Sequence, residues 1–175
     1  MLKKIKWVLL GLVAIAIIIG AYVVSLVRYA ETEATDLDNY VTSISAMSEV
    51  VSVQSIHRFN GLESYIVARI EHESGQDLYF FVRDGNVQYL FIASELINDV
   101  DANTIAHSLV QNGEIISTQL GILEGVAISE DQTEDDEDQG IPIFEVQIED
   151  EDEDVVHYIV INAWTSEVIM NFDVE

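Results

Sequence analysis

The sequence contains no cysteine and a single proline, and basic residues are almost as scarce. Without cysteine there can be no disulfide, no thiol nucleophile and no cysteine-based metal site, so apolar burial has to stabilise the fold. Only 7 lysines and arginines stand against 32 carboxylates, and none follows Arg83. Such a surface repels phosphate backbones and anionic headgroups, which disfavours nucleic-acid binding and peripheral lipid binding. Cations or basic partner proteins are favoured; the alternative is that the acidity is a general solubility device in salty surroundings.

Motifs that carry chemistry are also missing. The chain has no G-x-S-x-G elbow, no S-x-x-K motif, no Gly-rich phosphate loop and no H-E-x-x-H pair. The histidines are scattered, at His57, His72, His107 and His157. The sequence therefore predicts a protein that is not an enzyme, with no cofactor and no metal site.

Two acidic runs, 133–139 and 149–154, are the only candidates for a cation site. With Gly140 at the turn position of an EF-hand loop, acids are required where Gln139 and Val146 stand, so the pattern fails. We expect both runs to be solvated loops, with weak cation binding as the alternative.

The N-terminal segment from Trp7 to Val27 carries no charge. At ~1.5 Å per residue, a helix of this length spans roughly 30 Å, the thickness of the hydrocarbon core of a bilayer. A cleavable signal peptide has a shorter apolar region, of about 7–15 residues, and a small-residue cleavage site, whereas Arg28 follows this run. We therefore predict an uncleaved single-pass anchor, and the lysines at its start place the N-terminus in the cytoplasm and the rest of the chain outside.

Two periodicities alternate after the anchor. Apolar residues at helical spacing predict a helix over 37–51. Strict alternation then predicts a strand in "SYIVARIE" and a hairpin over 78–91 that turns at Asp84-Gly85. A two-residue turn would pair Val82 with Val87, Phe80 with Tyr89 and Leu78 with Phe91 on one face, which the helix would cover.

The same order follows a second time. Asp101 is predicted to cap a second helix that ends near Gly113, and strands are expected at about 114–128, 142–149, 155–162 and 167–174. Residues 65–82 slide onto 143–160 without a gap, so the second half reads as a copy of the first. The inward residues of the copy would be Phe144, Val146, Ile148, Val156, Tyr158 and Val160, continued by Val168, Met170 and Phe172, with His157 on the outward face.

Three aromatic side chains fall outside the predicted cores. Tyr79 and Phe81 lie on the strand face opposite the first core, and Trp164 lies at the turn of the second hairpin. They are candidate residues for contact with a protein partner. The alternative is that loops or the neighbouring module cover them.

The stretch "VVHYIVINAWTSEVIMNF" resembles the PepSY signature, in which a strand ends in a D-A-x-T-G-x-V-like turn. Asn162 and Ser166 stand for its Asp and Gly, while Ala163, Thr165 and Val168 are kept. Together with "FNGLESYIVARI" and "LYFFV", the chain resembles the TseB-like family of single-span membrane proteins of Gram-positive bacteria, which carry two cystatin/PepSY-like domains outside the membrane. The acidity and the 129–139 insertion depart from that pattern.

The resemblance and the residue patterns together give the expected organisation. The fold class is α+β, with a transmembrane helix followed by two helix-on-antiparallel-sheet domains. Residues 1–6 form a cytoplasmic tail, 7–27 the anchor, 28–94 the first domain and 95–175 the second, with its acidic insertion at 129–139.

The resemblance implies a non-catalytic regulator of cell-wall elongation that contacts a membrane-bound peptidoglycan synthase, a penicillin-binding protein. It brings no catalytic residues with it. PepSY-like domains elsewhere accompany protease precursors, so the alternative function is inhibition or chaperoning of an extracellular protease.

Overall fold

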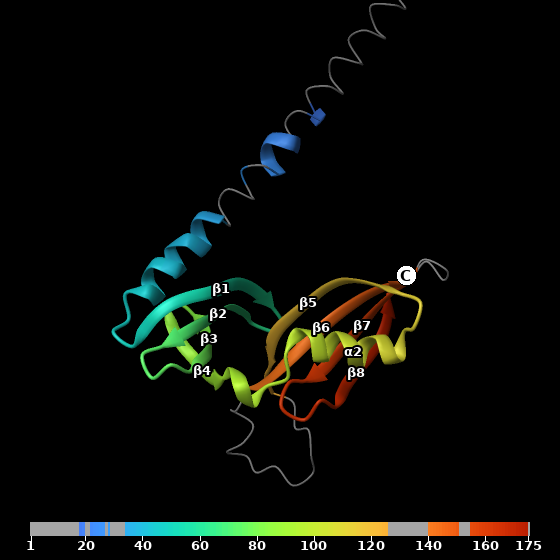
Figure 1. The fold of residues 1–175 in the computed structure, drawn as a ribbon. Helices are drawn as coiled ribbons and strands as arrows, with labels where there is room; N and C mark the ends of the chain where they lie inside the picture. The colour runs from blue at the N-terminus through green and yellow to red at the C-terminus, as the bar shows by residue number, and fades with distance from the viewer. Residues whose placement is uncertain are drawn as a thin grey trace, which may run out of the picture. The chain divides into compact units, whose positions relative to one another are not determined.

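The computed structural model describes residues 18–19, 22–26, 28, 34–125, 140–150 and 155–174. The chain divides into two compact units, Met1–Thr42 and Ser43–Glu175. All strands belong to the second unit, which forms two four-stranded antiparallel sheets in the orders β1-β2-β3-β4 and β5-β6-β7-β8 (Figure 1). The domain boundary expected between residues 94 and 95 falls between these sheets and stays a prediction.

The predicted fold class is corrected in two respects. The described residues form mostly antiparallel sheet with few helices, rather than an even α+β mixture. In addition, no helix in the described part of the chain combines the length and the apolar character needed to cross a bilayer. The expected anchor at 7–27, with the single-pass location, falls largely outside the described residues and is not supported.

The first sheet contains a strand that the sequence did not predict. The helix expected over 37–51 occupies residues 34–45, and the chain then enters β1, Val50–Asn60. β1 pairs with β2, Ser64–His72, through two bulges, between Val50 and Ser52 and between Val53 and Ser55. The helix prediction was wrong after residue 45 because the apolar residues of a bulged strand do not keep a strict period of two.

The predicted hairpin is confirmed, but its register is only partly right. β3, Asp77–Arg83, and β4, Asn86–Ile92, turn through Asp84 and Gly85 at φ 52° and 76°, the conformation of a two-residue hairpin turn. Val82 pairs with Val87 as expected. A bulge then adds one residue, so Phe80 pairs with Leu90 and Phe81 with Tyr89. Tyr89 and Phe91 therefore share a face with Tyr79 and Phe81, not with Phe80 and Leu78.

The second half follows the predicted order closely. A short 3-10 helix η1, Ala93–Glu95, leads to α2, Asp99–Leu109, which lies across one face of the second sheet (Figure 1). Its cap is Asn98, whose side chain accepts a hydrogen bond from the backbone N–H of Asp101 in a capping box, so Asp101 is the third helical residue and not the cap. The strands of the sheet are β5, Glu114–Leu123; β6, Ile141–Asp150; β7, Val155–Asn162; and β8, Val168–Val174.

One hydrophobic core joins the two sheets. It contains Phe59, Tyr65, Val67 and Phe81 from the first sheet and residues of α2 and of β5 to β7 from the second half. Phe59 packs so closely on β5 that a Cβ on Gly121 would lie 2.2 Å from its ring. The opposite face of the first sheet is buried as well, through residues such as Ile66, Ala68 and Phe80. The first sheet is therefore buried on both faces.

A polar network closes this shared core at the end of β5. The hydroxyls of Tyr65 and Tyr89 donate to the same carboxylate oxygen of Glu124, at 2.5 and 2.7 Å. Arg83 donates to the Tyr65 hydroxyl at 3.0 Å. Burial and the bond to Glu124 raise the pKa of both tyrosines, so they stay protonated donors. The network ties the first sheet to the segment that precedes the acidic insertion.

Candidate functional site

The two faces of the second sheet differ in what covers them. On one face, Phe144, Val146 and Ile148 of β6 pair with Ile161, Ile159 and His157 of β7, beneath α2. The other face carries Val156, Tyr158 and Val160 of β7, which pair with Val174, Phe172 and Met170 of β8. This second set lies away from α2.

Five side chains of that second set remain open to solvent in the described structure. We call Val156, Tyr158, Met170, Phe172 and Val174 the β7–β8 patch. Phe172 is 48% exposed, Val174 45% and Met170 38%, while Val156 and Tyr158 are half-buried. Tyr158 and Phe172 stack with their ring centroids 5.3 Å apart and their planes 9° from parallel. Adjacent exposed apolar side chains of this kind are typical of interaction surfaces rather than of single surface residues.

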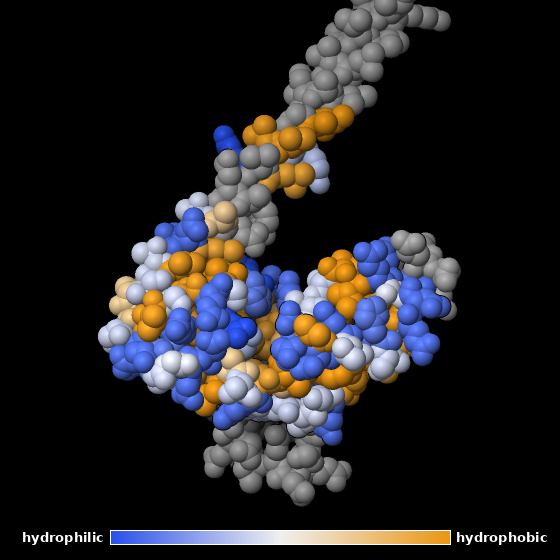
Figure 2. Space-filling view, viewed as in Figure 1, coloured by the Kyte–Doolittle hydropathy of each residue, from blue (hydrophilic) through white to orange (hydrophobic). Residues whose placement is uncertain are grey.

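The neighbouring half of the same face is acidic and polar. Glu149 pairs with Val156 on one side and Glu114 on the other, while Gln147 and Glu145 continue the face toward the shared core. Glu114 and Glu149 are exposed. The patch is therefore flanked by carboxylates, in a chain with a formal charge of −25. Figure 2 shows the side of the molecule that carries α2, where hydrophilic and hydrophobic residues are mixed.

His157 lies on the α2 side of the sheet, which corrects the outward position predicted for it. It pairs with the fully buried Ile148, and its Nδ1 lies 2.7 Å from Oδ1 of Asp173 on β8. Its Nε2 is buried and has no hydrogen-bond partner within the described residues. The bond to Asp173 connects β8 to β7 on the face opposite the patch.

The three predicted contact residues do not form one exposed surface. Phe81 is fully buried and packs edge-on against Phe91, with centroids 5.5 Å apart. Tyr79 is half-buried beside the guanidinium of Arg69. Trp164 is 45% exposed and packs edge-on against Phe91 at 5.4 Å. The second sheet covers Phe81, which was the alternative interpretation, and only Trp164 keeps a large exposed fraction.

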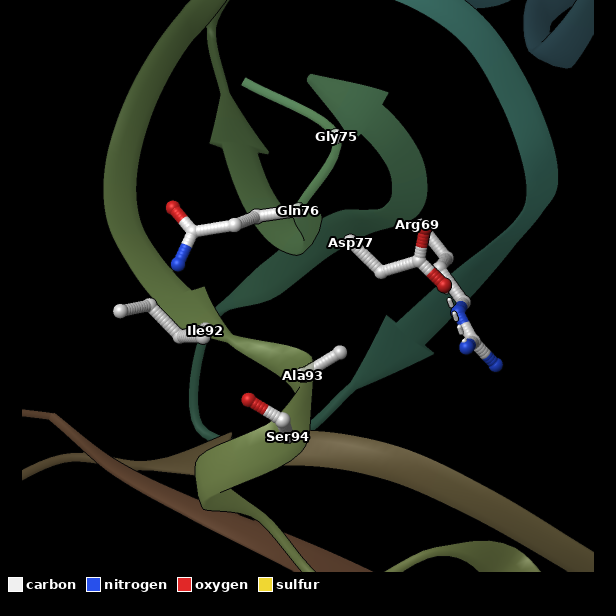
Figure 3. Close-up of a pocket in the computed structure, with 7 residues that line it drawn as sticks. All are labelled: Arg69, Gly75, Gln76, Asp77, Ile92, Ala93 and Ser94. Atoms are coloured by element: carbon white, nitrogen blue, oxygen red, sulfur yellow. Dashed lines mark hydrogen bonds and ion pairs between the residues drawn. The ribbon is translucent and has the colours of Figure 1, made fainter. Parts of the chain in front are cut away.

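Two pockets lie around Arg69. The first, of about 440 Å³, has Arg69 and Asp77 on one side and Gln76 and Ile92 on the other (Figure 3). Arg69 Nη2 donates to Asp77 Oδ2 at 2.6 Å, which neutralises the cation. The second, of about 220 Å³, brings Arg69 and Tyr79 near His57 and Asp99. Burial lowers the pKa of His57, whose Nε2 lies 2.9 Å from the carbonyl of Leu120.

The acidic runs can be only partly located. Residues 126–139 and 151–154 lie outside the described residues, so of the two runs only Glu149 and Asp150 are placed. Within the described part of the chain, no three histidine or acidic side chains gather as metal ligands would.

Comparison with known proteins adds little. No family model matches the chain, and no curated protein matches it. A solved structure, the YpmB protein from Bacillus subtilis, aligns over 81% of this chain and 94% of its own, with 17% identity and a TM-score of 0.48. At this level the likeness supports no inference about function.

Four residues of the β7–β8 patch, Val156, Tyr158, Met170 and Phe172, were predicted to lie in the core, and Val174 was not singled out. The signal that could have shown them to be a surface rather than a core is the presence of apolar residues on both faces of β7: Val156, Tyr158 and Val160 on one face, and Ile159 and Ile161 on the other. A strand with one solvated face normally alternates apolar and polar residues. A second apolar face, on a sheet that α2 alone covers among the described helices, indicates an interaction surface.

Proposed function

We propose that this protein is a non-catalytic adaptor that binds a basic partner protein through the β7–β8 patch. The observation that carries the proposal is the exposure of Met170, Phe172 and Val174 on one face of an edge strand, with the carboxylates of Glu149 and Glu114 beyond β7 on the same face. Apolar residues at the centre with polar residues around them are the usual composition of a protein interface.

Charge decides which partner fits. The carboxylates of Glu114 and Glu149 border the patch, and the rest of the chain adds a strong negative field. A partner with lysine or arginine around an apolar centre would be attracted over a distance and would dock with complementary charge. A second copy of this chain would bring like charges together, so it fits poorly. The resemblance to the TseB-like family makes a peptidoglycan synthase the first partner to test.

The proposal can be tested by photo-cross-linking from the full chain in its own cells. A photoreactive amino acid replaces Phe172 in one variant and Val100 in a control, because Val100 is an exposed apolar residue of α2, with 67% exposure. We expect a cross-linked partner at position 172 only, joined through a basic segment. The product should disappear when Tyr158→Ser is added.

Each outcome has a defined meaning. A peptidoglycan synthase linked at position 172 supports the proposal with the partner that the resemblance implies, and an extracellular protease supports the alternative function. Equal labelling at positions 172 and 100, or labelling that survives Tyr158→Ser, contradicts the proposal.

A further inference from the structure

β8 is an edge strand of the second sheet, because it pairs with β7 and with no other strand among the described residues. An edge strand turns the N–H and C=O groups of alternate residues away from its neighbour, where an extended peptide can pair with them. One bulge interrupts β8 near its start, between the pairs Ile161–Val168 and Val160–Met170. From Met170 to Val174 the pairing is regular, so this part presents an uninterrupted edge.

The other sheet edges are less suited to strand addition. β1 carries two bulges. β5 has one bulge near its start, as β8 does, but the Leu120 carbonyl of β5 already lies 2.9 Å from Nε2 of His57 on β1. The bulge of the β3–β4 pair falls in the middle of β4, between Val87 and Tyr89. Bulges twist an edge away from an incoming strand. Like the other edge strands, β8 carries no lysine or proline of the kind that commonly protects an edge.

The two sides of this edge have opposite chemistry. Met170, Phe172 and Val174 point to the patch side, and Asn171 and Asp173 point to the α2 side. The Asp173 side chain is 62% exposed, although one of its oxygens contacts His157. An added strand would therefore place every second side chain beside apolar groups and the intervening ones beside a carboxylate.

We infer that the partner binds by adding an extended segment to β8 as a fifth strand, and that this segment alternates apolar residues with lysine or arginine. Backbone hydrogen bonds to the edge supply affinity, and the alternating side chains supply specificity. This inference rests on the proposed function, because it names the binding mode and the partner segment for the same surface. Pairing of two β8 strands from two copies would place the carboxylate of Asp173 on both strands of the new pair, which like-charge repulsion disfavours.

The test uses a synthetic probe of about nine residues, alternating valine and lysine, which is long enough to span the strand. Three further peptides have the same composition: one with valines and lysines in separate blocks, one N-methylated at every valine, and one N-methylated at every lysine. In a perfectly alternating strand all valine amides point to one edge and all lysine amides to the other. Binding to the full chain is measured by fluorescence anisotropy.

We expect the alternating peptide to bind, and the block peptide to bind at least about tenfold more weakly despite its equal charge. One methylated peptide should lose at least about tenfold in affinity while the other keeps it, because only one set of amides faces β8. Hydrogen exchange of the 170–174 amides should slow only in the presence of the peptides that bind. Equal affinity of the two methylated peptides, or unchanged exchange in β8, would overturn the inference.

Failure of the inference can be distinguished from failure of the proposed function. If Tyr158→Ser abolishes the partner cross-linked at position 172 while the two methylated peptides bind equally, the patch binds a protein without strand addition. If Tyr158→Ser leaves both the cross-linked partner and peptide binding unchanged while circular dichroism shows a folded chain, the proposed function fails, and the inference fails with it.

Discussion

Adding a single methyl group at Gly121 should destabilise both sheets at once. A Cβ at this position of β5 would lie 2.2 Å from Cε2 and Cζ of Phe59 and 2.6 Å from Cδ2, whereas carbon atoms in contact prefer about 3.5–4.0 Å. The ring would have to move by more than an ångström. Phe59 is only 3% exposed, and the backbone at Gly61 lies close to its other edge, so the ring has little room to yield.

We expect Gly121→Ala to lower the free energy of unfolding by about 1–3 kcal/mol, the usual cost of overpacking a close-packed core. In a Phe59→Leu background the clashing ring atoms are gone, so the same substitution should cost less by about 1 kcal/mol or more, a coupling typical of residues in contact. Gln119→Ala, at an exposed position on the same strand, should stay within about 0.5 kcal/mol of the parent.

Urea unfolding measures these changes, with Trp164 as the fluorescent probe after Trp7→Phe and linear extrapolation to water. Hydrogen exchange in β2 and β3 reports on the first sheet. Because the clash lies between β1 and β5, hydrogen exchange in the first sheet should become faster in the same variants in which Trp164 fluorescence reports a lower free energy of unfolding. Additive costs in the double variant, or a first sheet that keeps its protection, would refute the shared core.

Three further outcomes are expected. Phe81→Ala should lower the free energy of unfolding by about 3–5 kcal/mol, measured by thermal or urea unfolding, because Phe81 is fully buried. A decrease below about 1 kcal/mol would indicate that Phe81 lies at the surface. Glu124→Ala should cost about 1–3 kcal/mol, since it leaves the buried Tyr65 hydroxyl without its acceptor, and Tyr65→Phe should remove most of that cost. Burial lowers the pKa of His57, so as the pH falls the unfolded chain binds a proton at this residue before the folded chain does. The contribution of the neutral His57 to the free energy of unfolding is therefore complete above about pH 6.5 and is lost as the pH falls toward the lowered pKa. His57→Gln should flatten the fall in Tm between about pH 7.5 and 5.5, and an unchanged slope would contradict it.

The sequence predicted the second half of the fold well for physical reasons. The second helix and the strands β6 and β7 come from local signals and lie close to where they were expected, as does the first-half turn at Asp84-Gly85. The cap, however, is Asn98 and not Asp101, and β7 turns the residues predicted to face inward to the other side of the sheet. β1 was missed because two bulges break its alternation, so that Val51 and the helix before it could be read as one periodic run. Bulges depend on the partner strand, which a local pattern does not contain.

The contact role of Tyr79, Phe81 and Trp164 stays a prediction, but the burial of Phe81 was missed for a related reason. Tyr79 and Phe81 were correctly placed on the face opposite the first core, but nothing local could show that the second sheet would cover that face. Burial by a module about eighty residues away depends on tertiary packing. Trp164 was found exposed at its turn, as a residue beside a hairpin end tends to be.

The two sheets differ by one residue in the pairing register of their second and third strands, β2–β3 and β6–β7. Sliding 65–82 onto 143–160 places Ile66 on Phe144 and Val82 on Val160, and Ile66 does pair with Val82, but Phe144 pairs with Ile161. A shift of one residue moves every side chain of a strand to the other face. β7 tolerates it because its alternate residues are apolar in both sets. The first set, with Ile159 and Ile161, therefore fills the space beneath α2, and the second set, with Tyr158, is left facing solvent. On the hypothesis that the second hairpin is a copy of the first, an apolar face can become exposed in this way without any new apolar residue, because the shift exposes residues that the register of the first hairpin would have buried.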